Sequence, residues 1–417
     1  MPSQSCIAWV DFSEEDRRKM IEVVSLFRLR DTRDELGLGS IRDALAELFF
    51  PGTNTLETRA RYLLFVPWLY RSYEQCRVPS AQIATRLRSD EVRLIYALQA
   101  GGESAGAGII GRVSGASLHR FPSSIYWASL HRWGILRYPG SPDQYQRSLD
   151  RFYLQHADGQ RADDNEPVAG RGGSNWDPRL PPAAEHFLER TSFTLTASEA
   201  AYLRERVTLS CPDSLLCTIL NRCAPVDWTV KFIWQHAQLA HFPGEQRSWI
   251  EHAQNFSETM HGAMLLYNLM LAEQSQQSEL TESYRSALAD WARTLATRGA
   301  SLCAWDRHAF WQLARRGGHI PSLTEQFVNA WLDIVLNDTS VPKLAEHARA
   351  RELVREREIW LKQGRSRLKN QKHLDLWTGA SGTGQLDYRW GIARRITNDI
   401  LVALAEPGRS GGEHAFY

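Results

Sequence analysis

The chain has 417 residues, of which 49 are basic and 48 acidic, so its formal net charge is +1. This balance excludes a field over the whole molecule that would attract nucleic acid or anionic lipid, and any polyanion site must be a local patch. The composition is 43% hydrophobic and 23% charged, with no apolar run of membrane-spanning length, which is typical of a soluble protein with more than one core. No secretory signal pattern opens the sequence, so we expect a cytoplasmic protein with no membrane partner.

Two amphipathic helices are predicted first. Ser13 and Asp16 have capping-box spacing, and apolar residues recur on one stripe over 14–30. Ser40 can cap the second helix, in which apolar residues recur at helical intervals until Pro51 and the glycine after it end the pattern. The start of the chain therefore indicates a helical fold.

A third helix is predicted to start at Asn54, which has capping-box spacing with Glu57, and to be kinked or ended by Pro67. The second and third helices form a helix-turn-helix pattern, in which the later helix can enter the DNA major groove. Arg59 flanks its apolar stripe, and Arg61 points away from it. The polar residues at its start are suitable donors: Thr53, Asn54, Thr55, Thr58 and Arg59. The alternative is an ordinary helical hairpin inside a core.

A glycine-rich stretch precedes a helix predicted over 124–133, and a glycine and a short apolar segment over 135–138 follow it. This order is typical of a winged-helix unit. No acidic residue occurs from 112 to 138, where Arg120 and Arg132 are among the basic residues, so the local potential should be positive. The alternative is that these arginines only solvate helix surfaces.

Residues 158–182 are polar, rich in glycine and proline, and lack periodicity, which indicates a flexible linker or a long loop. We therefore expect an N-terminal helical domain over 1–157 and a C-terminal α-helical domain over 183–417. Apolar residues recur at spacings of three and four in five C-terminal segments: 198–209, 226–241, 256–273, 282–296 and 323–338. This part should be an α-helical bundle or array.

The segment 349–372 contains nine basic residues against three acidic ones. On a continuous helix its later basic residues, namely Lys362, Arg365, Lys369 and Lys372, would share one face and could follow a phosphate backbone. The alternative is a solvated helix face with pairs of glutamate and arginine, which suits the part through Glu358 better.

Residues 378–395 begin as a loop of glycine, serine and threonine and continue as a predicted helix, whose first amides could hold an anion beside Arg389. The loop lacks the spacing and the lysine of a phosphate-binding P-loop, so nucleotide hydrolysis has no support here. The alternative is a flexible turn before a capped helix.

The histidines at 236, 241, 252 and 261 form the one cluster of this residue type, but their spacing is not that of metal ligands. We therefore assign no catalytic residue, no metal and no cofactor. An alternative is a metal-dependent nuclease or hydrolase that tertiary contacts assemble from dispersed histidines and carboxylates.

Four blocks of the sequence, over 9–17, 36–68, 122–135 and 361–390, together resemble the bacterial domain of unknown function 6361 family. The resemblance implies an association with helicases, nucleases and methyltransferases of anti-phage gene clusters. It supplies no catalytic residues.

These observations predict a mainly α, multi-helical protein that is not an enzyme and that binds DNA or RNA as an accessory or adaptor subunit of a bacterial defence complex. The alternative is a protein-interaction scaffold for a helicase or nuclease, without contact to nucleic acid. The candidate nucleic-acid-binding residues are Lys362, Arg365, Lys369, Lys372, Arg389, Arg59, Arg61, Arg120 and Arg132.

Overall fold

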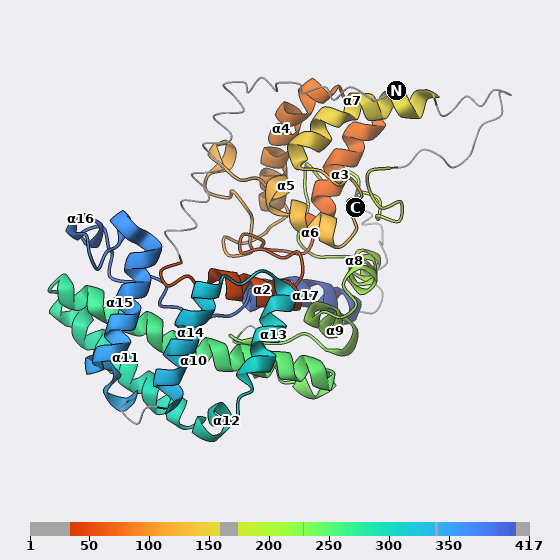
Figure 1. Cartoon of the computed structure of the whole chain (residues 1–417). Helices are drawn as coiled ribbons and strands as arrows, with labels where there is room; N and C mark the ends of the chain where they lie inside the picture. The colour runs from red at the N-terminus through yellow and green to blue at the C-terminus, as the bar shows by residue number, and fades with distance from the viewer. Residues whose placement is uncertain (1–33, 159–173, 228, 338–340, 406–417) are drawn as a thin grey trace, which may run out of the picture. The chain divides into compact units, whose positions relative to one another are not determined.

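The computed structural model describes residues 34–158, 174–227, 229–337 and 341–405 (Figure 1). The helix predicted over 14–30 lies outside these residues. The chain forms two compact units, each from two separate segments: unit 1 is Met1–Asp43 with His252–Leu386, and unit 2 is Ala44–Glu251 with Asp387–Tyr417. This division differs from the expected one, which placed a boundary at 158–182.

The mainly α fold class is confirmed, because the described residues consist of α-helices, short 3-10 helices and connecting turns. Their one β-type feature is an isolated bridge between Leu136 and Trp176. The short apolar segment over 135–138 therefore forms no strand of a wing. Within the described ranges, no helix combines the length and the apolar character that crossing a membrane requires.

Unit 1 contains most of the C-terminal helices that the sequence predicts. Its helices are the later part of α10 (Gly244–Gln274), α11 (Ser278–Ala296), α12 (Gly299–Cys303), α13 (Arg307–Gly317), α14 (Ser322–Asn337), α15 (Ala348–Lys362) and α16 (Gln371–Leu374), with the start of α2 (Gly39–Phe49). The periodic segments 256–273, 282–296 and 323–338 correspond to α10, α11 and α14, and these predictions are confirmed.

Helix α10 is the centre of unit 1, and α13 and α14 cross it (Figure 1). The Trp331 indole of α14 donates to the Thr259 carbonyl of α10 at 3.0 Å, which fixes one crossing. At Gly262 a side chain would begin 2.4 Å from the Trp291 ring of α11. Glycine at this position therefore permits the close approach of α11 to α10.

Unit 2 is also helical and has an aromatic core. Its helices are the later part of α2, α3 (Tyr62–Gln75), α4 (Ser80–Ala100), α5 (Pro122–Ile125), α6 (Trp127–Arg132), α7 (Pro142–Asp158), α8 (Ala197–Ser210), α9 (Leu215–Arg222), the start of α10, and α17 (Trp390–Ala405). Tyr70, Trp127 and Tyr145 pack with ring centroids 5.0 to 5.8 Å apart. A capping box between Thr196 and Glu199 starts α8, which confirms the helix predicted over 198–209.

The end of the predicted linker belongs to this core. Residues 159–173 lie outside the described residues, but Trp176 is fully buried and stacks on Tyr70 at 5.7 Å. The Asp177 carboxylate pairs with Arg206 at 2.6 Å. Residues 174–182 contain no helix and are therefore a loop, one of the two alternatives that the sequence left open. A buried indole and a buried ion pair hold this loop against the core despite its polar composition.

The prediction of a helix over 226–241 is wrong. Apart from residue 228, which lies outside the described ranges, this segment has only the 3-10 turns Ile233–Gln235 and Leu239–His241. The Asn398 side chain of α17 accepts from the Val226 N–H and donates to its carbonyl, and the Trp390 indole donates to the Val230 carbonyl. Backbone groups that a helix would use internally are thus bound to side chains of α17.

Candidate nucleic-acid interface

The basic segment of unit 1 does not continue as one helix. Helix α15 ends at Lys362, because Gln363 has a φ of 48°, in the left-handed region, and the 3-10 turn Gln363–Arg365 follows. The chain then reverses before the short α16. The prediction that Lys362, Arg365, Lys369 and Lys372 share one helical face is therefore wrong.

A buried carboxylate stabilises this reversal. Glu358 is fully buried on α15 and accepts hydrogen bonds from the Ser366 hydroxyl and from the Arg367 N–H, the latter at 2.7 Å. Burial raises the pKa of Glu358, and these hydrogen bonds act against the rise. Glu358 therefore anchors the turn and does not form part of a solvated row of charge pairs.

A second buried carboxylate removes cations from the surface. Glu35 lies 3.6 Å from the Lys362 ammonium and 2.8 Å from the Arg367 guanidinium. The Lys362 side chain is only 7% exposed. Lys362, a predicted phosphate ligand, therefore belongs to an internal ion-pair network.

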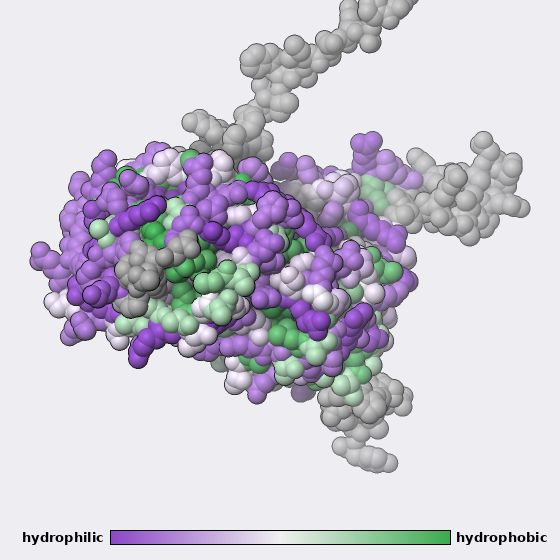
Figure 2. Space-filling view, turned by 60° about the horizontal axis from the view of Figure 1, so that its bottom comes forward, coloured by the Kyte–Doolittle hydropathy of each residue, from purple (hydrophilic) through white to green (hydrophobic). Residues whose placement is uncertain are grey.

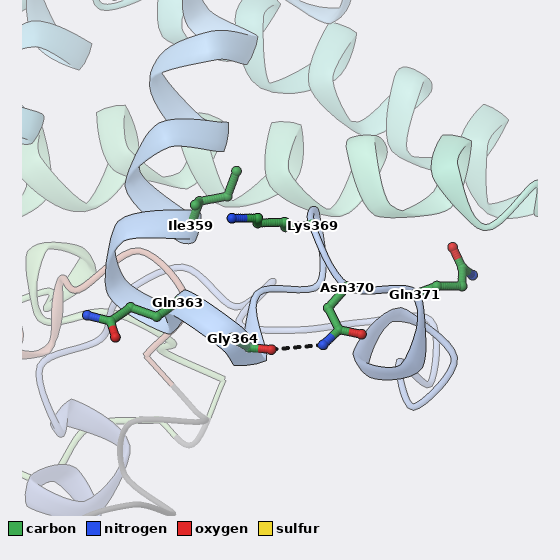
Figure 3. A pocket seen from close by; sticks show the side chains of 6 residues that line it. All are labelled: Ile359, Gln363, Gly364, Lys369, Asn370 and Gln371. Carbon is green, nitrogen blue, oxygen red and sulfur yellow. Dashed lines mark hydrogen bonds between the residues drawn. The ribbon is translucent and has the colours of Figure 1, made fainter.

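The remaining predicted cations of this segment, Arg365, Lys369 and Lys372, are exposed. Lys369 lines a hollow of about 510 Å³ together with Ile359, Gln363, Gly364, Asn370 and Gln371. Figure 3 shows Lys369 reaching toward Ile359, with the two glutamine side chains on opposite sides.

Asn370 gives this hollow a fixed wall. Its side-chain amide donates to the Gly364 carbonyl at 2.9 Å, as the dashed line in Figure 3 shows, and its oxygen accepts from the Lys372 N–H at 3.1 Å. Both bonds hold the turn in shape, and the second one caps α16. The turn thus presents an ammonium and amide groups in a hollow, a chemistry that suits a phosphate or a polar base edge.

In unit 2 the predicted helix-turn-helix is not found. Helix α3 starts at Tyr62, not at Asn54, and continues through Pro67. Three of the five expected DNA donors have internal acceptors: the Thr53 hydroxyl binds the Phe50 carbonyl, the Asn54 amide binds the Ile125 carbonyl, and the Thr58 hydroxyl binds the Gly108 carbonyl. Thr55 is exposed. Residues 53–61 are thus a packed connection.

Two predicted arginines of this connection are also internal. Arg59 forms a bidentate pair with Asp399, at 2.9 Å from Nε and 2.8 Å from a terminal nitrogen. Arg61 pairs with Glu199 at 2.9 Å and donates to the Ser192 carbonyl. These contacts leave neither guanidinium available to a phosphate.

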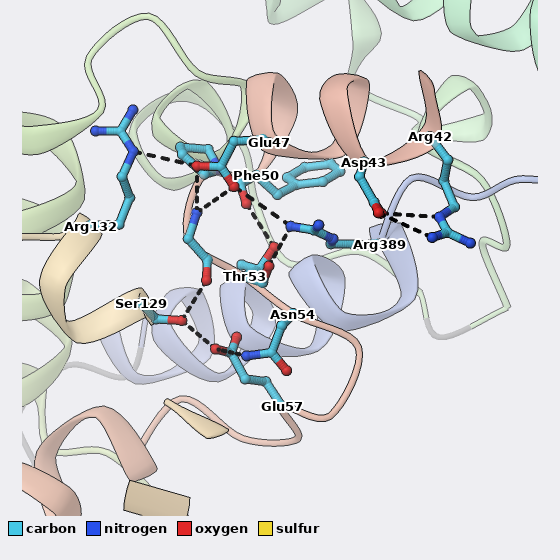
Figure 4. A network of polar contacts seen from close by, with 12 residues as sticks. Arg42, Asp43, Glu47, Phe50, Thr53, Asn54, Glu57, Ser129, Arg132 and Arg389 are labelled. Carbon is cyan, nitrogen blue, oxygen red and sulfur yellow. Dashed lines mark hydrogen bonds and ion pairs between the residues drawn. The ribbon is translucent and has the colours of Figure 1, made fainter. Parts of the chain in front are cut away.

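A polar network closes the turn before this connection (Figure 4). Arg389 donates to the Thr53 carbonyl at 2.5 Å, and its guanidinium lies 3.6 Å from Glu47. Arg132 approaches the same carboxylate at 3.5 Å, but its side chain is 49% exposed. Arg389 is therefore mainly internal, whereas Arg132 is half-exposed. Arg120 is exposed on the loop before α5.

Below this turn lies a buried acid. The Glu57 carboxyl contacts the Ser129 hydroxyl and accepts from the Asn54 amide at 3.0 Å (Figure 4). Burial raises the pKa of Glu57 to about 8, so the carboxyl is mostly protonated at neutral pH. Ser129 is fully buried, so this pair is structural.

The four histidines do not assemble into a metal site. His261 of α10 contacts the Thr383 carbonyl at 3.0 Å, and His252 accepts from the Trp305 indole at 2.9 Å. His236 and His241 belong to unit 2. Across the described ranges, no group of three potential metal-ligating side chains lies together.

The glycine-rich loop before α17 is fixed by α10. The Asn268 amide donates to the Ser381 carbonyl and its oxygen accepts from the Ser381 N–H, both at 2.8 Å. The Ser257 hydroxyl donates to the Leu386 carbonyl. The amides at the start of α17, which were the candidates for an anion, are also occupied, because the Arg389 and Gly391 N–H groups donate to the Asp387 carboxylate at 3.1 and 3.4 Å.

The fold and the exposed turn define a mainly helical protein with a polar hollow beside three exposed cations. The chain matches the Family of unknown function (DUF6361) over residues 4–404, and it belongs to this family. The family membership that the four sequence blocks suggest is thereby confirmed. No curated protein and no solved structure matches the chain.

Sequence reasoning missed three residues of this region. Glu35 carries no signal in a local pattern, because the tertiary fold brings its partners Lys362 and Arg367 to it. Asn370 could have been noticed as a helix N-cap, because its partner Lys372 lies two residues away. Trp360 could have been noticed, since it is an aromatic residue within a strongly charged stretch. It is 53% exposed.

Proposed function

We propose that this chain binds DNA or RNA through the turn that carries Arg365, Lys369 and Lys372. The observation that supports the proposal is the separation of charges in this segment: Lys362 and Arg367 are paired with Glu35, whereas these three cations remain exposed beside a hollow. Exposed cations around a concave surface can replace the counterions of a phosphate backbone.

The accessory or adaptor role in a bacterial anti-phage complex is part of the same proposal. It rests on the association that the family resemblance implies, and a helicase or nuclease would be the protein partner. A nucleic-acid site outside any catalytic centre suits a subunit that positions a substrate for such a partner.

The test is a salt series of fluorescence anisotropy with labelled DNA and RNA. The variant carries Arg365→Gln, Lys369→Gln and Lys372→Gln. Each lost phosphate contact should reduce the slope of log affinity against log salt by about 0.7 to 0.9, so three contacts should reduce it by about 2.1 to 2.7. The matched control carries Arg86→Gln, Arg147→Gln and Arg190→Gln, three exposed arginines of unit 2. Equal slopes for the two variants, or no binding by the wild type, would refute the proposal.

A protein-interaction scaffold is the second candidate, and an exposed apolar site in unit 2 favours it. Val113 is 99% exposed and Tyr96 of α4 is 58% exposed. Both border the loop around Gly115: Val113 lies two residues before it, and the Tyr96 hydroxyl lies 3.7 Å from the position that a Cβ atom would take at Gly115. Co-purification after nuclease treatment separates the two candidate functions, because a scaffold should keep its protein partner when nucleic acid is digested. The double variant Tyr96→Ser and Val113→Ser should lose that partner.

A further inference from the structure

Trp360 is an exposed indole on α15, one residue after Ile359, which lines the hollow. Large aromatic side chains are normally buried, because each removes an extensive apolar surface from water. Trp360 remains 53% exposed in a helix that is otherwise rich in charge. It is therefore a candidate for contact with a ligand.

The orientation of this indole is fixed by a buried arginine. The Arg357 guanidinium lies over the Trp360 ring at 5.4 Å and over the Phe327 ring at 5.2 Å. Arg357 cannot easily move, since it donates to the Leu36 carbonyl at 2.9 Å and to the Thr324 hydroxyl at 2.8 Å. The ring thus has a cation on one side and exposed surface for a partner, at little cost in side-chain entropy.

The hollow lies further along the same part of the chain. Gln363 and Gly364, which line it, follow Trp360 by three and four residues, just past the end of α15 at Lys362. Gln363 and Gln371 are exposed amides that can both donate to and accept from base edges. Lys369 supplies the charge for a phosphate between them (Figure 3).

We infer that Trp360 is a stacking platform for an unpaired base and that the ligand of this surface is single-stranded nucleic acid. The inference rests on the proposed function and deepens it. In a duplex the bases are stacked on each other and expose no face to a side chain, whereas single strands combine free base faces with phosphates. An indole, amides and a lysine in one region match that combination.

The experiment compares labelled single-stranded DNA and RNA with a duplex closed by hairpin loops, so that no terminal base pair can stack on the indole. Fluorescence anisotropy at one fixed salt concentration measures the wild type, Trp360→Ala, Trp360→Phe and the control Leu376→Ala. Leu376 is 72% exposed in the same unit. Circular dichroism checks that all variants are folded.

We expect Trp360→Ala to weaken single-strand binding about tenfold, the size of one stacking contact, and to leave duplex binding unchanged. Trp360→Phe should retain most of the affinity, and Leu376→Ala all of it. Salt-sensitive binding that is insensitive to Trp360, or a wild type that prefers the closed duplex, would overturn this inference and leave the proposed function intact. Absence of binding to every nucleic acid would overturn both.

Comparison of DNA with RNA identifies the strand type. A preference for one of them would show that the hollow distinguishes the 2′-hydroxyl. Equal affinities that fall together in Trp360→Ala would support stacking as the shared chemistry.

Discussion

The connection over 53–61 in unit 2 and the turn over 363–372 in unit 1 both contain basic residues that the sequence assigns to nucleic acid, but their charges have different surroundings. In the first, Asp399 and Glu199 pair with Arg59 and Arg61. In the second, Glu35 pairs with Arg367 and with Lys362, which directly precedes the turn. Arg365, Lys369 and Lys372 remain exposed. The comparison teaches that a basic residue becomes a candidate ligand for phosphate only where no carboxylate of the fold reaches it.

The largest effect should follow from Asp399→Ala in unit 2. The Asp399 side chain is 6% exposed, and its loss leaves the Arg59 guanidinium without its bidentate partner. We expect the free energy of unfolding, measured by urea denaturation, to fall by about 3 kcal/mol. The control Asp213→Ala removes an exposed carboxylate of the same unit and should change it by less than about 0.5 kcal/mol. Equal stabilities would show that the pairing in unit 2 is not structural.

The matching change in unit 1 is Glu35→Gln. It removes the countercharge that Glu35 supplies to Lys362 and Arg367, so we expect a loss of about 2 kcal/mol in the free energy of unfolding. Anisotropy should show nucleic-acid affinity that is equal to or above the wild-type value, because no exposed cation is lost. A fall in affinity in the folded variant would place Glu35 in the binding surface and break the comparison.

A pH series tests the buried acid under the packed turn of unit 2. The pKa of Glu57 is raised by burial from 4.5 to about 8, so the folded state binds this proton where the unfolded state has released it. The free energy of unfolding should therefore fall as pH rises from about 4.5 to about 8, by at most about 1.4 kcal/mol per pH unit.

Glu57→Gln removes this titration, so the free energy of unfolding should fall less steeply with pH in this variant. Glu91 contributes a similar slope, because burial raises its pKa to about 8 as well. The control Glu185→Gln, at an exposed position, should leave the slope unchanged. An unchanged slope in Glu57→Gln would show that this carboxyl is ionised in the folded state.

A smaller effect is expected from the exposed arginines of unit 2. The double variant Arg120→Gln and Arg132→Gln should lower nucleic-acid affinity by less than about threefold, since neither residue lines the hollow. The reference is the loss of affinity of the variant with Arg365→Gln, Lys369→Gln and Lys372→Gln, measured by the same fluorescence anisotropy. A loss as large as that of the triple variant would place a second interface in unit 2.

An effect of similar size should come from Asn370→Ala. This change removes the hydrogen bonds to the Gly364 carbonyl and from the Lys372 N–H, and it should cost about 1 kcal/mol of stability. We expect a two- to threefold loss of affinity, because the exposed cations remain but the turn is less ordered. Asn370→Asp, which keeps the cap acceptor, should recover stability but weaken binding through its negative charge.

Helices were the predictable part of this protein. The segments of α8, α10, α11 and α14 could be located from apolar spacing, and the start of α8 from its capping box. The segment 226–241 shows the limit of this reasoning, because its apolar spacing is helical while its backbone binds Asn398 and Trp390. Local periodicity cannot detect a competing partner from another part of the chain.

The sequence by itself determined the helical class, the position of several helices and the family, because these depend on residues three or four apart or on contiguous blocks. Only the tertiary structure decided which cations are free. The partners of Arg367 and Arg59 lie 332 and 340 residues away in the chain. Such ion pairs form because folding brings distant charges together in a medium of low polarity, where an unpaired charge is costly.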